Sequence, residues 1–238
     1  RIRFTTSHPK DFNYELAQIS QKHRHKIMEY IHLPAQSGNS QVLERMNRGY
    51  TREEYIEKAQ MLLREIPNCV LSTDLIVGFP GETEAEFQET ISLVQEARFL
   101  AAYTFQYSKR PGTPAATMEN QISDEVMRER YERLHKIQQQ ISQEVNTEVV
   151  GSEQEILVAD HEGRRDEQNA RMSGRTKDFR LTHFAIDPKN PPRPGDAVIS
   201  KITSAAPNFI LADELPVSIR RTRGGAATEE RVKESNQP

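Results

Sequence analysis

The chain has 238 residues, one cysteine and a formal net charge of −3, with 35% hydrophobic and 28% charged residues. This length accommodates two domains, the near-neutral charge gives no general sign of a nucleic-acid binder, and one cysteine excludes an internal disulfide and a cysteine-ligated metal cluster built from this chain alone. No apolar run approaches the roughly 20 residues that span a bilayer, and the N-terminus lacks a signal-peptide core, so the sequence predicts a cytoplasmic protein with no membrane segment.

Strand-like and helical segments alternate over the first 106 residues. The strand-like segments are 2–5, 30–33, 70–79 and 102–106, and the helical segments are 11–25, 51–66 and 83–98. The second and third helical segments open with Thr-x-x-Glu, which is a capping-box signature. Strand, helix and strand at this spacing predict right-handed crossovers and a parallel sheet. Four such units are about half of a (β/α)₈ barrel, so we expect an open, incomplete sheet.

The third strand, within "STDLIVGFPGETEAEF", is unusually polar for a buried strand. Side chains alternate between the two faces of a strand, so Ser72 and Asp74 share one face while Leu71 and Leu75 share the other. A carboxylate at such a position needs a hydrogen-bonding partner or a wet cavity. The sequence leaves two interpretations open, a functional cavity or a simple hydrogen bond from Asp74 to a neighbouring loop.

Polar residues accumulate where the predicted strands end, in "HLPAQSGNS", "GFPGET" and "QYSKRPGT". Ligands of parallel α/β folds bind at the carboxyl ends of strands, so these loops form the predicted site. His8 and His32 lack a spacing that pairs them with other metal ligands, and we interpret both as hydrogen-bonding residues. Cys69 precedes a strand and is interpreted as a small buried residue.

A long helix over 124–146 is predicted to connect this region to a second region with a different sequence pattern. From residue 151, five short strand-like segments predict a small antiparallel barrel of the OB type. Basic residues cluster there, and Phe179 and Phe184 lie in the same stretch. RNA or DNA contact and a solvated loop are equally open interpretations of this pattern. The tail from Pro216 loses its apolar pattern and is predicted to be disordered. The basic residues are Arg164, Arg165, Arg171, Arg175, Lys177 and Arg180.

Together these strings resemble the methylthiotransferases of the radical S-adenosylmethionine (SAM) superfamily, and most closely the MiaB-type branch that modifies tRNA. The resemblance is carried by "HLPAQSGNSQVLERMNRGYTREEY", "STDLIVGFPGETEAEF" and "FQYSKRPGTPAATMENQ", with "MSGRT" in a terminal domain similar to TRAM. It implies a truncated radical SAM barrel with its connector helix at 1–145, a TRAM-like RNA-binding β-barrel at 146–215, and the tail at 216–238. The chain starts with Arg1 rather than Met, directly in a strand, and we expect a segment of a longer protein.

The resemblance also implies cofactors and contacts. SAM would bind at Gln36, Ser37, Asp74, Gly78 and Glu82, which we expect on one rim. Two [4Fe–4S] clusters would belong to the full-length enzyme, and their cysteine ligands are absent from this chain. No catalytic residue and no metal ligand is assigned within the chain. RNA contacts would come from Arg110, Arg164, Arg165, Arg175, Lys177 and Arg180.

The implied reaction adds a 2-methylthio group to N6-isopentenyladenosine beside the anticodon, with the tRNA anticodon stem-loop as partner and a monomer as the expected state. Arg110 in "YSKRPGT" favours this substrate, because RimO-type enzymes, which modify a ribosomal protein, more often carry an acidic pair there. The chain alone is expected to be inactive. Two alternatives remain, a RimO-type methylthiotransferase and a non-catalytic RNA-binding module.

Overall fold

The structure, a computed structural model, describes residues 1–5, 8–160, 163 and 169–224. It divides the chain into two compact units, Arg1–Ser142 and Gln143–Pro238. One long helix, α5 (Asp124–Thr147), contains the point of division, close to the end of the connector helix predicted from the sequence. Each unit is described separately below.

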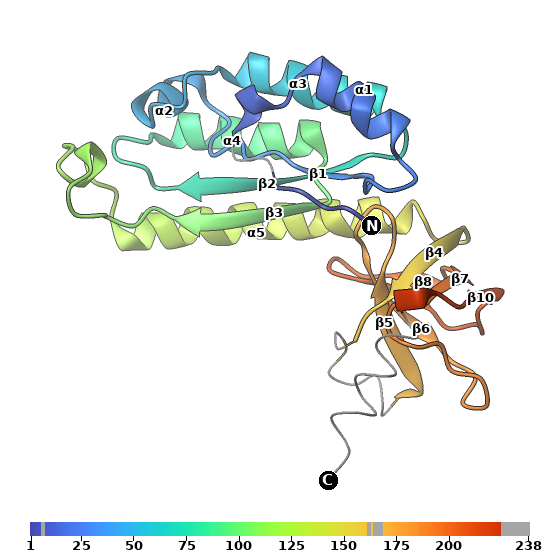
Figure 1. Ribbon diagram of the computed structural model, residues 1–238. Coiled ribbons are helices and arrows are strands. Elements are labelled where there is room, and N and C mark those ends of the chain that lie inside the picture. Colours follow the sequence, from blue (N-terminus) through green and yellow to red (C-terminus); the bar gives the residue numbers. More distant parts are fainter. Residues whose placement is uncertain (6–7, 161–162, 164–168, 225–238) are drawn as a thin grey trace, which may run out of the picture. The chain divides into compact units, whose positions relative to one another are not determined.

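The first unit is built on a three-stranded parallel sheet (Figure 1). Its strands lie in the order β1 (Tyr30–His32), β2 (Val70–Val77) and β3 (Ala101–Gln106). The central strand, β2, is the longest. The segment at 2–5 makes only an isolated bridge between Ile2 and Ile27, and is therefore not the full strand that was predicted. Among the described residues the open, incomplete parallel sheet is confirmed, with three strands in place of four.

The helices of this unit precede β1, connect the three strands, or follow β3. They are η1 (Pro9–Asp11), α1 (Tyr14–Lys22), α2 (Ser40–Arg45), α3 (Arg52–Glu65), α4 (Glu84–Ala97), η2 (Pro114–Ala116) and the first part of α5. Figure 1 shows α3 and α4 over one face of the sheet. The predicted capping boxes of Thr51 with Glu54 and Thr83 with Glu86 are both formed, and they fix where α3 and α4 begin.

Helix α1 is shorter than predicted. Asn13 caps it by accepting a hydrogen bond from the Leu16 amide at 2.9 Å, so the helix begins at Tyr14 rather than at residue 11. Its buried residues are Ala17 and Ser20, whereas Ile19 is 51% exposed.

The buried core of the first unit lies between the helices and one face of β2. Leu71, Thr73, Leu75 and Val77 alternate along that face, and all four are buried. Tyr55 and Leu62 of α3, Phe87 and Val94 of α4, and Phe99 are also buried. The predicted alternation of β2 is confirmed, because its other face carries Ser72, Asp74 and Ile76.

The second unit is a small all-β unit with one seven-stranded sheet in the order β10-β7-β4-β5-β6-β9-β8. All pairings are antiparallel except that of β6 with β9, which is parallel. Its apolar core contains Ile156, Val158, Phe184, Val198, Ile202, Ile210 and Ala212. The strands are β4 (Glu153–Val158), β5 (Arg171–Arg175), β6 (Leu181–Ala185), β7 (Ala197–Lys201), β8 (Ser204–Ala205), β9 (Ile210–Ala212) and β10 (Ser218–Arg220).

The five predicted strands of this unit are present, and two further strands were missed. Strand β10 pairs antiparallel with β7, so the prediction of a disordered tail from Pro216 is wrong for its first part. The Thr222 amide also donates to Asp196 at 2.8 Å, which fixes the chain just after β10. Residues 225–238, the rest of that predicted tail, lie outside the described residues. In the described part of the chain no helix is both long and apolar enough to cross a membrane.

Candidate ligand-binding site at the strand ends

A cavity of about 550 Å³ opens at the carboxyl ends of the three parallel strands. It is lined by Gln36, Met46, Arg48, Asp74, Ile76, Phe79, Phe105, Gln106, Tyr107, Ser108, Arg110, Thr113 and Ala115. Strand β2 and the segments that follow β1, β2 and β3 all contribute, as expected for a ligand site of a parallel α/β fold. Three residues singled out in the sequence, Gln36, Asp74 and Arg110, therefore meet at one cavity.

Asp74 lies on the face of β2 that is turned away from the buried core. Its side chain is 29% exposed, whereas Leu75, the next residue along, is fully buried on the opposite face. The carboxylate therefore reaches the cavity rather than the helical layer. This placement answers the question that the polar strand raised, because the cavity gives Asp74 access to solvent or ligand.

His32 of β1 connects Asp74 to the interior of the sheet. Its Nε2 atom lies 3.4 Å from Asp74 Oδ2, and its Nδ1 atom lies 2.9 Å from Ser72 Oγ. No group of three or more metal-ligating side chains was found among the described residues. The interpretation of His32 as a hydrogen-bonding histidine is confirmed, and His8 likewise caps η1 by accepting from the Lys10 amide.

Gln36 reaches the cavity through a strained backbone. Its φ angle is 69°, in the left-handed region, which costs a residue other than glycine roughly 1–2 kcal/mol. The Gln36 amide donates to the Asp74 carbonyl at 2.8 Å, and the Gln36 carbonyl accepts from the Ile76 amide at 2.9 Å. These two bonds hold Gln36 against β2 beside Asp74.

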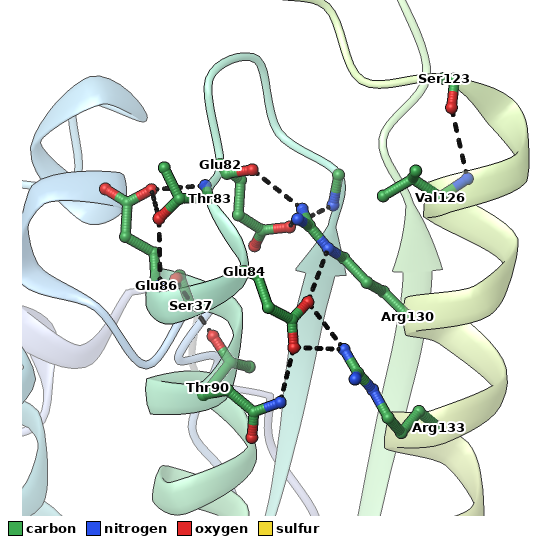
Figure 2. A network of polar contacts seen from close by, with 12 residues as sticks. Ser37, Glu82, Thr83, Glu84, Glu86, Thr90, Ser123, Val126, Arg130 and Arg133 are labelled. Atoms are coloured by element: carbon green, nitrogen blue, oxygen red, sulfur yellow. Dashed lines mark hydrogen bonds and ion pairs between the residues drawn. The ribbon is translucent and has the colours of Figure 1, made fainter.

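Ser37 does not line the cavity, although it follows Gln36 directly. It is buried, and its hydroxyl lies 3.4 Å from the hydroxyl of Thr90 on α4 (Figure 2). The next residue, Gly38, packs so closely on α4 that an added Cβ would lie 2.5 Å from the Glu89 carbonyl oxygen. The expectation that Ser37 shares a rim with Asp74 is therefore wrong, and Ser37 fastens the loop to α4.

Gly78 and Glu82 are also absent from the residues that line the cavity. The Gly78 amide donates to Glu82 Oε2 at 2.8 Å, and Arg130 Nη1 of α5 donates to the same oxygen at 2.7 Å (Figure 2). Gly78 has φ 76°, and an added Cβ would lie 2.1 Å from the Met127 side chain. Both residues therefore lock the Gly-Phe-Pro-Gly turn against α5 and do not share the Asp74 rim.

The ion pair of Glu82 with Arg130 is buried. The Glu82 side chain is 0% exposed and that of Arg130 is 6% exposed. Burial raises the pKa of the Glu82 carboxyl, while the Gly78 amide and Arg130 oppose that rise. On the next turn of α5, Arg133 contacts the exposed Glu84 at 2.8 Å. Sequence reasoning missed Arg130, because the helical pattern marked its position only as part of a polar face.

Two guanidinium groups line the cavity beside the carboxylate of Asp74. The turn that carries Arg110 is held by Thr113, whose hydroxyl donates to the Arg110 carbonyl at 2.8 Å. Arg48 was not predicted. It follows the short helix α2, which the sequence pattern also missed. Phe79, Phe105 and Tyr107 add aromatic surface. The cavity thus combines one carboxylate, two cations and aromatic walls.

The predicted RNA contacts of the second unit separate into two groups. Arg175 and Lys177 are half-buried, and the Arg175 guanidinium lies 4.5 Å from the centre of the Phe179 ring. Phe184, by contrast, is completely buried in the core and offers no ring to a ligand, contrary to expectation. Arg164 and Arg165 lie outside the described residues.

Arg180 is a structural residue rather than a surface cation. Its Nε donates to Asn146 Oδ1 at 3.0 Å and its Nη2 donates to the Val145 carbonyl at 3.2 Å. It also forms an ion pair with Asp178, and burial lowers the pKa of Arg180 to about 10. Its prediction as an RNA contact is wrong, because these groups consume the donors that a phosphate would need.

The one cysteine, Cys69, is buried, and burial raises the pKa of its thiol to about 12. A thiolate is the form that attacks an electrophile or binds iron, so this side chain is suited to neither task. The interpretation of Cys69 as a small buried residue is confirmed.

Comparison with known proteins identifies the class first. The family model of the radical SAM superfamily matches residues 1–94. The coproporphyrinogen III oxidase of Escherichia coli, described as a radical SAM enzyme, is similar in structure over 54% of this chain and 31% of its own, with 20% identity and a TM-score of 0.44. The match of residues 1–94 to the family model indicates that the first unit is a partial radical SAM α/β fold.

Curated relatives then give the family. A tRNA-2-methylthio-N(6)-dimethylallyladenosine synthase of Thermobifida fusca is 46% identical over the whole chain, which covers 48% of that protein. The synthase of the same name from Streptomyces viridosporus is 48% identical over 97% of the chain, which covers 45% of it. This chain is thus similar over nearly its whole length to these synthases, and it spans about half the length of the curated relatives it matches.

Proposed function

We propose that this chain is part of a tRNA methylthiotransferase that adds a 2-methylthio group to N6-isopentenyladenosine beside the anticodon. The observation that carries the proposal is the identity of 46% over all 238 residues with a synthase of that name. The cavity supports it, because Asp74 and two arginines meet at the strand ends of a radical SAM fold. The reaction would take place in the cytoplasm, on a tRNA bound by a monomer.

The cavity fits SAM chemically. The carboxylate of Asp74 can accept hydrogen bonds from the ribose hydroxyls or the amino group of SAM, and its charge favours the sulfonium. Arg48 or Arg110 can bind the SAM carboxylate, and the aromatic walls offer a surface for adenine. When bound, SAM supplies the carbon-centred radical that this superfamily uses. Of the five predicted SAM contacts, Gln36 and Asp74 would hold SAM directly, while Ser37, Gly78 and Glu82 would shape the loops around it.

The iron–sulfur chemistry of the family does not fit the cysteine content of this chain. A cluster needs several thiolate ligands, and the sequence contains one cysteine, which is buried. We therefore propose that the clusters, two of them in the full-length enzyme, are held by residues outside these 238. The 238 residues of this chain would then have no methylthiotransferase activity by themselves.

Binding of tRNA is proposed for both units of the chain. Arg110 lies at the cavity. In the TRAM-like unit Arg175 is the last residue of β5, and Lys177 lies between β5 and β6. Such side chains bind phosphates of the anticodon stem-loop with little dependence on base sequence. Arg110 also favours a tRNA substrate over a ribosomal protein, because a guanidinium complements phosphate.

Replacing Asp74 by Asn is expected to weaken SAM binding by about tenfold or more, since a hydrogen bond to a charged group contributes about 1.5–3 kcal/mol. Asn has nearly the same volume and lacks the charge. The dissociation constant of SAM is measured on the chain by equilibrium dialysis with radiolabelled SAM.

Glu119→Gln is the matched control, because it also removes one carboxylate charge but lies exposed and away from the cavity. It should bind SAM like the wild type. Equal dissociation constants for the wild type and Asp74→Asn would place SAM elsewhere and contradict the proposed site.

The double variant Arg175→Glu and Lys177→Glu is expected to bind an anticodon stem-loop less tightly and with a flatter salt dependence. Phosphate contacts release counterions, so losing two contacts should reduce the log–log slope by about one to two units. Fluorescence anisotropy of a labelled stem-loop between low and moderate salt gives the slope.

Lys189→Glu with Lys201→Glu makes the same change of net charge at two other exposed positions of the second unit. This control should keep most of the wild-type slope. If both double variants lower the slope equally, the effect is one of overall charge, and the proposed contacts of Arg175 and Lys177 are wrong.

A further inference from the structure

A chain of polar contacts crosses the sheet behind the cavity. Asp74 meets His32 Nε2, and His32 Nδ1 meets the hydroxyl of Ser72, which is wholly buried. The Tyr30 phenol is hydrogen-bonded to Ser72 and to Tyr103 in turn. Register explains this grouping, because His32 pairs with Ser72 and Asp74 pairs with Tyr103, which puts all of these side chains on one face.

These contacts fix the orientation of the His32 ring. The Ser72 hydroxyl binds one ring nitrogen, and Tyr103 packs against the ring edge at a centroid distance of 6.0 Å. The other nitrogen, Nε2, faces the carboxylate of Asp74. An ionised carboxylate can only accept, so a hydrogen bond across this 3.4 Å contact requires the proton on Nε2, and Nδ1 of the neutral ring then accepts from Ser72. His32 thereby occupies Oδ2 of Asp74 and leaves Oδ1 for the cavity.

We propose that His32 is a positioning residue that presents Asp74 to SAM. The proposal rests on the proposed SAM site. The His32 ring, held by Ser72, keeps the carboxylate of Asp74 turned toward the cavity, where its charge favours a ligand with a sulfonium.

The test compares the dissociation constant of SAM for the wild type, His32→Ala and His32→Gln. His32→Ala loses the contact with Asp74 and should bind SAM about three- to fivefold more weakly, the effect of one modest polar contact. Gln can donate to Asp74 and accept from Ser72, so His32→Gln should bind SAM nearly as the wild type does. His135→Ala, at an exposed histidine on α5, should also bind SAM as the wild type does.

A second measurement needs no SAM and covers the case in which His32→Gln fails to fold. Long-range ¹H–¹⁵N spectra of the unliganded wild-type chain at pH 8 should show His32 protonated at Nε2, whereas protonation at Nδ1 would overturn the proposal. If SAM binds and depends on Asp74, but a folded His32→Ala binds SAM as tightly as the wild type does, the role of His32 is refuted while the proposed site stands. If the predicted tautomer is seen but SAM does not bind, the proposed SAM site is wrong, whereas the inferred orientation of the His32 ring stands.

Discussion

Replacing Arg130 by Met should lower the free energy of unfolding of the first unit by about 3–5 kcal/mol, the usual loss when one partner of a buried ion pair is removed. Met keeps much of the side-chain volume, so the loss would come from the charge and its hydrogen bonds. Arg130 donates to both the side chain and the carbonyl of Glu82, and without it Glu82 would be a buried carboxylate bonded only to the Gly78 amide. Urea unfolding followed by circular dichroism of the helices measures the change.

The stability loss of Arg130→Met should also depend on pH, and the direction of that dependence can be predicted. Burial raises the pKa of Glu82 in the folded chain, and loss of Arg130 raises it further. A carboxyl with a raised folded-state pKa contributes stability below its unfolded-state pKa, and that contribution is lost as pH rises through the folded-state pKa. The deficit of Arg130→Met relative to the wild type should therefore shrink as the pH is lowered from 7.5 toward 5.

Arg133→Met is the matched control, because it removes the same group one turn further along α5. Its partner Glu84 is 53% exposed, and exposed pairs contribute at most about 1 kcal/mol. Adding Glu82→Gln to Arg130→Met should recover part of the loss by removing the stranded charge. Similar losses in the two single variants would show that burial of the Glu82 pair is not what stabilises the turn.

Replacing Arg180 by Met should destabilise the second unit by about 3 kcal/mol and leave the salt dependence of RNA binding unchanged. The variant loses the bonds to Asn146 and Val145 and strands the carboxylate of Asp178. The second unit contains neither tryptophan nor tyrosine, so amide hydrogen exchange of β5 and β6, followed by mass spectrometry, is the suitable measurement.

Lys177→Met provides the comparison from the same basic cluster. Because Lys177 is only half-buried, unlike Arg180, the variant is expected to change stability by no more than about 0.5 kcal/mol and to flatten the salt slope. The two variants should therefore have opposite profiles. An Arg180→Met chain that is stable but binds RNA with a flatter slope would restore the original prediction for Arg180.

Local sequence signals predicted much of the first unit. The capping boxes of Thr51 and Thr83 depend on residues three apart, and the polar face of β2 follows from simple alternation. Where sequence reasoning failed, contacts distant in sequence decided the outcome. Ser37 turns to Thr90, and Glu82 turns to Arg130, each more than 45 residues away.

The candidate site shows the same division between local and distant causes. Asp74 was predicted from its strand, and Gln36 and Arg110 from polar strand ends. Nothing in the sequence indicated the left-handed turn at Gln36, which separates it from its neighbour Ser37. The clustering of basic residues in the sequence likewise could not reveal that Arg180 is buried against Asn146, 34 positions earlier.

Strand β10 determines where this chain can be shortened safely. A boundary placed at residue 215, as the apolar pattern suggests, would remove the strand that pairs with Ile199 and Val198 of β7. It would also remove two donors to the buried carboxylate of Asp196, namely the Thr222 amide and Arg221. The open edge of β7 could then pair with another copy, the usual route to aggregation of trimmed β-sheet proteins. Expression of the second unit alone should therefore extend to residue 224.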